Sequence, residues 1–229
     1  MTLTELQKPR AIKSFVLRQG RMTLGQNVAL EQLWPIFGLD PAQTFYAMDT
    51  FGREGPLVLE IGFGNGESLV EMARVEPEAD FLGIEVHRPG VGHLLLKAQQ
   101  LGLQNIRVYC ADAVEILRNR IPAGSLGRVQ IFFPDPWPKK RHHKRRLVNA
   151  EFLALVVERL KPGGVLHCAT DWEDYAEQML ASFEATVSLR NQAGEGRFAE
   201  RPASRPLTKF ELRGQGLGHG VWDLLFEKV

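Results

Sequence analysis

The sequence predicts an α/β fold in which a mostly parallel sheet carries helices on both faces. Hydrophobic runs of strand length alternate along the chain with segments whose apolar residues recur at helical spacing. The first run, 57–61, is almost wholly apolar, as expected of a parallel strand covered on both faces. With 229 residues, 44% of them hydrophobic, the chain can build one sizeable core, so we expect one main domain.

A glycine-rich loop follows this first strand and precedes a helical pattern over 68–73. Glu60 stands before the loop, and Gly62, Gly64 and Gly66 alternate within it. Glycine allows the sharp turn and the close approach of a ligand to the backbone. The last glycine of a dinucleotide motif is replaced by Glu67, whose charge would repel a pyrophosphate. The loop resembles the first motif of class I methyltransferases, which bind S-adenosylmethionine (SAM), although a purely structural turn is the alternative.

Two further strands end beside acidic residues. The segment 80–86 reads as the second strand and contains Glu85, at the distance after the glycines where a Rossmann-like fold binds ribose hydroxyls. A helix over 89–101 follows, beginning near Pro89. The third strand, 105–111, leads to Asp112, whose carboxylate can accept a hydrogen bond from an adenine amino group. The backbone N–H of Ala113 can donate a second hydrogen bond to the adenine. Asp112 also suits the N-cap of a helix over 113–120, and both roles are compatible.

The fourth strand, 127–133, runs into a proline-rich loop and then a basic segment. Pro134, Pro136 and Pro138 stiffen the loop, and six of the eight residues from 139 to 146 are Lys or Arg. Such a run is commonly a solvated face, but at the edge of the sheet that holds the ligand it favours phosphate binding. His142 and His143 are adjacent and lack a neighbouring Cys or acid, so we assign them to an RNA surface and predict no metal site.

The remaining segments complete the expected sheet. A helix over 147–160, a strand over 165–170 closed by Asp171, and a helix over 174–183 precede a polar loop, 191–206, that we expect to be mobile. A final strand over 221–226 is expected to pair antiparallel with the segment 185–189, which makes seven strands in all. The basic arm 1–26 precedes the domain 27–229. Its composition fits either a disordered tail or an RNA-contacting arm that orders on binding.

Taken in order, these motifs resemble bacterial tRNA (guanine-N7-)-methyltransferases over most of the chain. The motifs are L-E-I-G-F-G-N-G, G-I-E-V-H, A-D-A, F-F-P-D-P-W with the basic run, A-T-D and T-K-F-E. The resemblance implies a class I methyltransferase fold that transfers a methyl group from SAM to N7 of a tRNA guanine, guanosine 46 of the variable loop. It implies SAM contacts from Glu60, Gly62, Gly64, Gly66, Glu85, Asp112, Ala113 and Asp135. It implies substrate contacts on the tRNA side from Lys139, Asp171, Thr208, Lys209, Phe210 and Glu211, of which Asp171 and Glu211 are expected to touch the guanine, and RNA contacts from Arg141, His142, His143, Lys144, Arg145 and Arg146.

The chemistry agrees with this assignment, while two alternatives stay open. The lone pair of guanine N7 needs no proton removed, so acids that orient the base suffice, and Asp135 is the residue expected nearest the transfer. An exocyclic-amine RNA methyltransferase is one alternative, although Asp135-Pro136-Trp137 lacks the second proline of the amine-methylating loop. A SAM- and RNA-binding protein without turnover is the other.

Composition bears on the compartment and the partners. No apolar run approaches the roughly 18 residues of a membrane span. The N-terminus has no apolar stretch of a secretory signal, and Cys110 and Cys168 form no C-x-x-C pair. We therefore expect a cytoplasmic protein with tRNA as its partner and no membrane association. The sequence leaves open a monomer or a homodimer.

Overall fold

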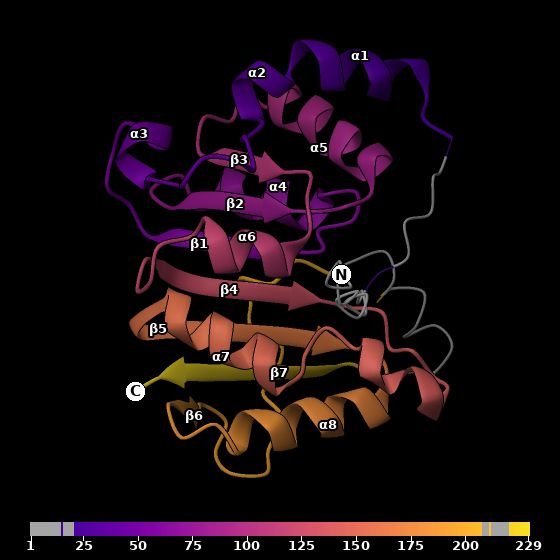
Figure 1. Cartoon of the computed structure of the whole chain (residues 1–229), viewed down its shortest axis with the longest axis vertical. Helices are drawn as coiled ribbons and strands as arrows, with labels where there is room; N and C mark the ends of the chain where they lie inside the picture. The colour runs from indigo at the N-terminus through magenta and orange to yellow at the C-terminus, as the bar shows by residue number, and fades with distance from the viewer. Residues whose placement is uncertain (1–14, 16–20, 208–210, 212–219) are drawn as a thin grey trace, which may run out of the picture.

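The computed structural model describes residues 15, 21–207, 211 and 220–229, and within them the strands form a single seven-stranded sheet. The strand order is β3-β2-β1-β4-β5-β7-β6, with β1 to β5 parallel and β7 antiparallel to both of its neighbours (Figure 1). This confirms the predicted fold class and the antiparallel final strand. The strands are β1 Leu57–Ile61, β2 Asp80–Ile84, β3 Ile106–Tyr109, β4 Leu126–Phe132, β5 Leu160–Thr170, β6 Leu189–Asn191 and β7 Trp222–Lys228.

Helices cover the two faces of the sheet and bury two apolar clusters. Along β1, Leu57, Leu59 and Ile61 point to the face packed by α6, α7 and α8, whereas Val58 points to the face packed by α4 and α5. The second face also receives α1 and α2, with α1 lying against α5 (Figure 1), whereas α3 packs against the first cluster. The helices are α1 Leu24–Gln32, α2 Trp34–Phe37, α3 Ala47–Phe51, α4 Glu67–Val75, α5 Arg88–Gln100, α6 Ala113–Asn119, α7 Ala150–Arg159, α8 Glu173–Glu184 and the 3₁₀ helix η1 Lys140–Arg145.

The order of the strands determines where a ligand can bind. From β1 the chain proceeds outward through β2 to β3, then returns to β4 on the other side of β1. A crevice forms where the direction reverses, at the carboxyl ends of β1 and β4. In Figure 1 the carboxyl ends of the parallel strands lie at the right-hand edge, which places the glycine loop and the proline-rich loop at one edge of the sheet.

Three segments differ from the sequence-based expectations. Helix α1 begins at Leu24 behind a Thr23 capping box, and the side-chain amide of Gln26 donates to the Pro89 carbonyl at 3.1 Å, so packed structure starts before the expected boundary at residue 27. The basic run forms η1, and α7 begins only at Ala150. The expected mobile loop 191–206 instead packs on the sheet, because Ala199 pairs with β7 and Arg205 is fully buried.

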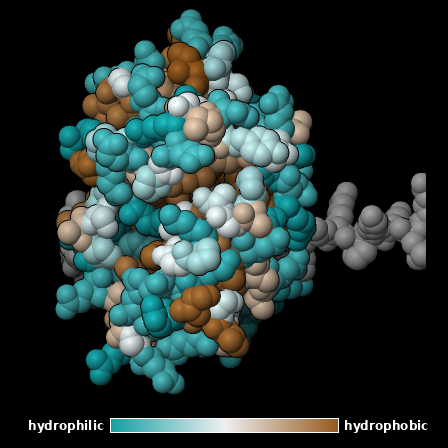
Figure 2. Space-filling view, turned by 90° about the vertical axis from the view of Figure 1, so that its left-hand side faces the viewer, coloured by the Kyte–Doolittle hydropathy of each residue, from teal (hydrophilic) through white to brown (hydrophobic). Residues whose placement is uncertain are grey.

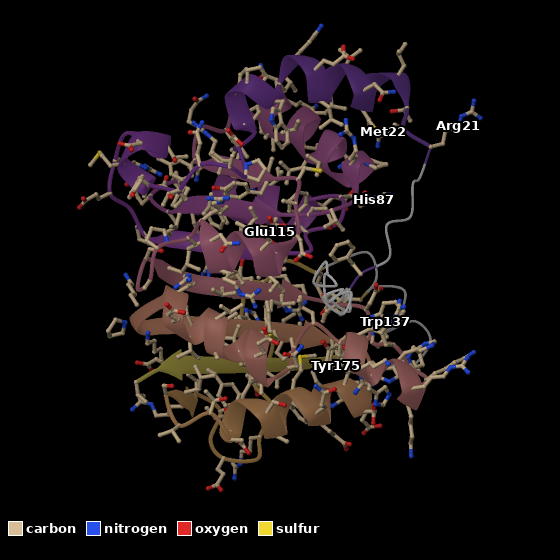
Figure 3. The ribbon with its side chains drawn as sticks, viewed as in Figure 1. Arg21, Met22, His87, Glu115, Trp137 and Tyr175 are labelled. Atoms are coloured by element: carbon tan, nitrogen blue, oxygen red, sulfur yellow. The ribbon has the colours of Figure 1, made fainter. Side chains whose placement is uncertain are left out.

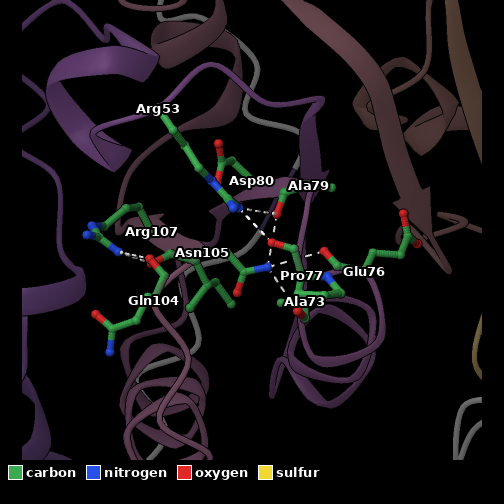
Figure 4. A network of polar contacts seen from close by, with 10 residues as sticks. Arg53, Ala73, Glu76, Pro77, Ala79, Asp80, Gln104, Asn105 and Arg107 are labelled. Atoms are coloured by element: carbon green, nitrogen blue, oxygen red, sulfur yellow. Dashed lines mark hydrogen bonds and ion pairs between the residues drawn. The ribbon is translucent and has the colours of Figure 1, made fainter.

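The opposite edge, at the amino ends of the strands, is closed by a polar network (Figure 4). Asn105 donates to the carbonyls of Ala73 and Ala79, both at 2.9 Å, and Arg53 pairs with the buried carboxylate of Asp80 at 2.7 Å. Figure 2 views this side and shows a largely hydrophilic surface with scattered apolar side chains. In the described part of the chain, no helix is both long and apolar enough to cross a membrane.

Candidate active site

The glycine loop has the backbone that its three glycines predict. Gly62, Gly64 and Gly66 adopt φ of 75°, 58° and 75°, in the left-handed region that side chains disfavour. A Cβ on Gly66 would also lie 2.5 Å from the Leu94 side chain, so both the backbone conformation and the lack of space disfavour a side chain at this position. The loop therefore leads directly from β1 into α4 and leaves its backbone open toward the crevice.

Glu60 is buried at the base of the crevice, with only 3% of its surface exposed. Its Oε2 has no hydrogen-bond partner within the described residues. Burial, and to a lesser extent the Glu85 carboxylate, raise the pKa of Glu60 to about 8, although Arg128 opposes the shift. A buried carboxyl group that lacks a partner and faces a glycine loop fits a cationic ligand group, such as the ammonium of the SAM amino-acid end.

Glu85 follows β2 and is tied to the glycine loop. One carboxylate oxygen accepts from the Gly64 amide at 2.9 Å, and the other accepts from the amides of Val86 and His87 at 2.7 and 2.9 Å. These bonds hold the carboxylate at the mouth of the crevice. Glu85 thus stands where the sequence predicts a ribose acceptor, and it also fixes the position of Gly64.

Two cavities flank the glycine loop and share Gly62, Phe132 and Phe133. The first, of about 210 Å³, is bounded by Glu85, Asp112, Ala113 and Asp135, four residues predicted to contact SAM. The second, of about 400 Å³, is bounded by Glu60 and by the loop with its three glycines. Asp112 also caps α6, accepting from the Val114 amide at 2.9 Å, so both roles considered for it are geometrically compatible. The pair of cavities suits a nucleoside joined to an amino acid.

The proline-rich loop after β4 is held in an unusual backbone conformation. Phe133 and Trp137 adopt φ of 52° and 49° on either side of Asp135, and such values are rare for bulky residues. The Phe133 amide donates to the Ala169 carbonyl at 2.8 Å, which ties the loop to β5. Asp135 is exposed at the rim of the first cavity. Trp137 lies at the edge of the molecule that also carries His87 (Figure 3).

The basic run divides into exposed and enclosed residues. Lys139, Arg141 and Lys144 are exposed, whereas Arg145 stacks on the Trp137 ring with its guanidinium carbon 4.9 Å from the ring centre. His142 contacts the same ring, and the partial loss of solvent and the surrounding cations lower its pKa. The surface is therefore strongly cationic beside the proline-rich loop.

Arg146 behaves differently from the rest of the run and is only 2% exposed. Its guanidinium donates to the Pro136 carbonyl at 2.9 Å, to Gln178 at 2.8 Å and to the carboxylate of Asp174, and it stacks on Tyr175. The pKa of Asp174 is lowered by this bond. The sequence predicts an RNA contact for Arg146, but in this structure its guanidinium is enclosed and anchors the proline-rich loop to α8.

The residues predicted to contact the substrate on the tRNA side are only partly brought together. Asp171 is exposed directly after β5, next to the strand that leads to Asp135, as expected of acids that close neighbouring strands. Glu211 is buried and forms a two-pronged ion pair with Arg205, with both N–O distances 2.6 Å. Thr208, Lys209 and Phe210 lie outside the described residues.

Sequence reasoning missed several residues of the site. Phe15 of the basic arm, Phe132 and Phe133 bound the first cavity, and Pro206 and Leu207 bound the second. The paired phenylalanines directly before Pro134-Asp135-Pro136 were the available signal, since they end a strand at the ligand edge. No local pattern indicates Phe15, Pro206 or Leu207, because each reaches the site through a long-range contact.

Comparison with known proteins agrees with this geometry. A family model described as "Putative methyltransferase" matches residues 54–224. A tRNA (guanine-N(7)-)-methyltransferase of Methylococcus capsulatus is 60% identical over 227 residues, covering 99% of this chain and 98% of that protein. The protein of that name from Alcanivorax borkumensis is 58% identical, covering 96% and 92%. The crystal structure of the 16S rRNA methyltransferase KamB has a similar fold, with a TM-score of 0.59, 17% identity, and coverage of 81% and 94%.

These features define a class I, SAM-dependent methyltransferase: the sheet is parallel with an antiparallel final strand, a glycine loop lies at its switch point, and acids lie at the strand ends. Nearly full-length identity of about 60% narrows the assignment further. The chain belongs to the tRNA (guanine-N7-)-methyltransferase family.

Proposed function

We propose that this protein transfers the methyl group of SAM to N7 of a guanine in tRNA, and that the target is guanosine 46 of the variable loop. The observation that carries the proposal is the placement of three features at one sheet edge: the double cavity, the proline-rich loop with Asp135, and the cationic η1. The names of the relatives at about 60% identity support the same substrate and the same ring nitrogen.

Different residues around the two cavities bind different parts of the cofactor. Glu60 and the glycine loop take the amino-acid end, Glu85 takes the ribose hydroxyls, and Asp112 and Ala113 take the adenine edge. When bound, SAM supplies an electrophilic methyl group on a positively charged sulfur. Phe132 and Phe133 border both cavities, so we assign them to the point where these ends meet.

The acids at the rim orient the base and do not need to remove a proton from it. Guanine N7 has a free lone pair, so positioning and charge stabilisation account for the chemistry. With N7 directed at the cofactor, the N1–H and N2 amino edge faces protein, and carboxylates are suitable acceptors for it. Asp135 borders the cofactor cavity and Asp171 follows the adjacent strand, so we assign both to this task.

The cationic surface binds the tRNA backbone. Lys139, Arg141 and Lys144 are exposed beside the proline-rich loop, where they can meet the phosphates that flank an unstacked guanosine. Arg145, stacked on Trp137, adds a fixed positive charge to the same surface.

The test uses labelled SAM and a tRNA transcript, followed by strand scission selective for 7-methylguanosine. We expect one cleavage site, at guanosine 46, and no labelling when that guanosine is replaced by adenosine. Label without scission would indicate an exocyclic amine as the acceptor. SAM and tRNA binding without any label would indicate a binding protein, and either result would refute the proposal.

A further inference from the structure

Four ionisable side chains form a buried cluster beside the second cavity, which we call the Arg205 cluster: His167, Arg205, Glu211 and Asp223. Their side chains are between 0% and 4% exposed. Arg205 donates to both oxygens of Glu211 at 2.6 Å and to both oxygens of Asp223 at 2.8 and 2.9 Å. Asp223 also contacts the ring nitrogen of His167 at 2.7 Å. One guanidinium therefore joins two carboxylates in fixed geometry.

The cluster connects the sheet to the residues that border the cavities. His167 lies on β5 and Asp223 on the adjacent β7. The guanidinium of Arg205 lies 5.8 Å from the ring centre of Phe132 and 5.7 Å from that of Phe133, the two rings shared by both cavities. Arg205 is thus the point at which the loop after β6 is attached to the active-site wall.

The two residues that follow Arg205 belong to the wall of the second cavity. Pro206 and Leu207, directly after Arg205, border this cavity together with Glu60 and the glycine loop. Six residues later Glu211 returns to the same guanidinium. The ion pair therefore fixes the residue from which this part of the cavity wall begins.

A guanidinium is the group that this arrangement requires. Its planar fork donates two parallel bonds to each carboxylate, which the single ammonium of a lysine cannot reproduce. Burying one cation with two carboxylates contributes little net stability, because desolvation offsets the attraction. What such a cluster does confer is one fixed register of the segments that carry it.

We propose that Arg205 is a positioning residue for methyl transfer, and that Glu211 acts through Arg205 instead of contacting the guanine. Asp223 and Glu211 together fix Arg205 against the sheet, so that Pro206 and Leu207 are held in the wall of the cofactor cavity. This inference rests on the proposed function and replaces the guanine contact that the sequence assigns to Glu211. Asp135 and Asp171 then remain as the acceptors for the base.

The first test is a double-mutant cycle between Arg205→Lys and Glu211→Gln. If both residues act through one ion pair, each single variant loses about tenfold or more in kcat/KM for tRNA, and the double variant loses no more than the worse single variant. Losses that multiply in the double variant, or an Arg205→Lys enzyme within about twofold of wild type, would overturn the proposal.

The second test asks whether Glu211 contacts the base. The target guanosine is replaced by inosine, which lacks the N2 amino group, or by 2-aminopurine riboside, which lacks the N1 proton. A positioning residue lowers kcat/KM by the same factor on all three tRNAs. If the effect of Glu211→Gln disappears with either analogue, Glu211 contacts that atom and the proposal fails.

SAM affinity, measured by calorimetry, separates this inference from the proposed function. Because Pro206 and Leu207 border the cofactor cavity, Arg205→Lys and Glu211→Gln should each weaken SAM binding by about threefold or more, again without additivity. This readout holds even if wild-type protein yields no 7-methylguanosine, a result that would refute only the proposed function. Unchanged SAM affinity in both variants would refute the positioning role at the cavity.

Control variants distinguish positioning from loss of folding. Arg190→Lys changes an exposed arginine paired with Glu227 at the far end of β7, and it should leave all three readouts unchanged. Urea denaturation identifies folded variants. If Arg205→Lys does not fold, a second double-mutant cycle is built from Glu211→Gln and Asp223→Asn, which keep the guanidinium and each alter one of its carboxylate partners. Folded variants with wild-type kinetics and SAM affinity would show that the cluster is only structural.

Discussion

Glu60→Gln is expected to stabilise the protein without ligand while it weakens cofactor binding. The pKa of Glu60 is raised from 4.5 to about 8 in the folded protein, chiefly by burial. Above pH 4.5 the unfolded chain releases this proton whereas the folded protein retains it, so stability is lost as pH rises from 4.5 toward 8. The loss is about 1.4 kcal/mol per pH unit, or about 3 kcal/mol at pH 7.

A glutamine of the same shape removes this cost, because it has no charge to desolvate. The free energy of unfolding at pH 7 should therefore rise by about 3 kcal/mol, and the midpoint temperature by about 2–4 °C for each kcal/mol. SAM binding should weaken by about 1.5–3 kcal/mol, the usual loss when a hydrogen bond to a charged group is removed. The two effects have opposite signs.

Urea denaturation at pH 4.5 and pH 7, with and without SAM, measures both quantities. Glu177→Gln, an exposed carboxylate on α8, serves as the matched control and should change stability by less than about 0.5 kcal/mol. A Glu60→Gln protein that is no more stable than wild type at pH 7, or equally stabilised at both pH values, would refute the electrostatic argument. Unchanged SAM affinity would refute the assignment of Glu60 to the cofactor.

Three further predictions concern the cofactor, the RNA surface and pH. Glu85→Ala should weaken SAM binding by about 1.5–3 kcal/mol, since the ribose acceptor and the Gly64 contact are lost, and calorimetry showing wild-type affinity would contradict this. Replacing Arg141 and Lys144 by Ala should weaken tRNA binding and flatten its salt dependence, and an unchanged log–log salt slope would show that this surface is only solvated. Arg146→Ala should mainly lower the free energy of unfolding, by about 2 kcal/mol, because its guanidinium is buried and hydrogen-bonded. Burial lowers the pKa of His167, so the unfolded chain takes up its proton first as pH falls below 6.5, and stability is lost toward acid pH. His167→Gln should reduce that slope between about pH 6.5 and 5 in urea denaturation, and an identical slope would contradict a neutral buried imidazole.

Much of the fold and of the cofactor site follows from local patterns in the sequence. A buried parallel strand shows a continuous apolar run, and an acid or glycine that ends the run must lie at the carboxyl edge of the sheet. The glycine loop, Glu85 and Asp112 were predicted on that basis and Glu60 and Asp135 by the family resemblance. The structure places all of them around two adjoining cavities.

The sequence cannot tell which charged residues are buried. Arg145 and Arg146 are neighbours in one basic run, yet one stacks on Trp137 and the other is enclosed by α8. The difference depends on where α8 packs, which is a long-range property. Charge runs predict an electrostatic surface as a whole, but not the role of each member.

By itself, the sequence determined the class of fold, the cofactor edge and the cationic surface, because strand periodicity, glycine spacing and charge clustering are local. Only the tertiary structure decided how the C-terminal part completes the site. Strand β7 lies between β5 and β6, which brings Asp223 beside His167 and beneath Arg205. Asp223 on β7 binds the buried guanidinium of Arg205, and this guanidinium is the partner that the buried carboxylate of Glu211 requires.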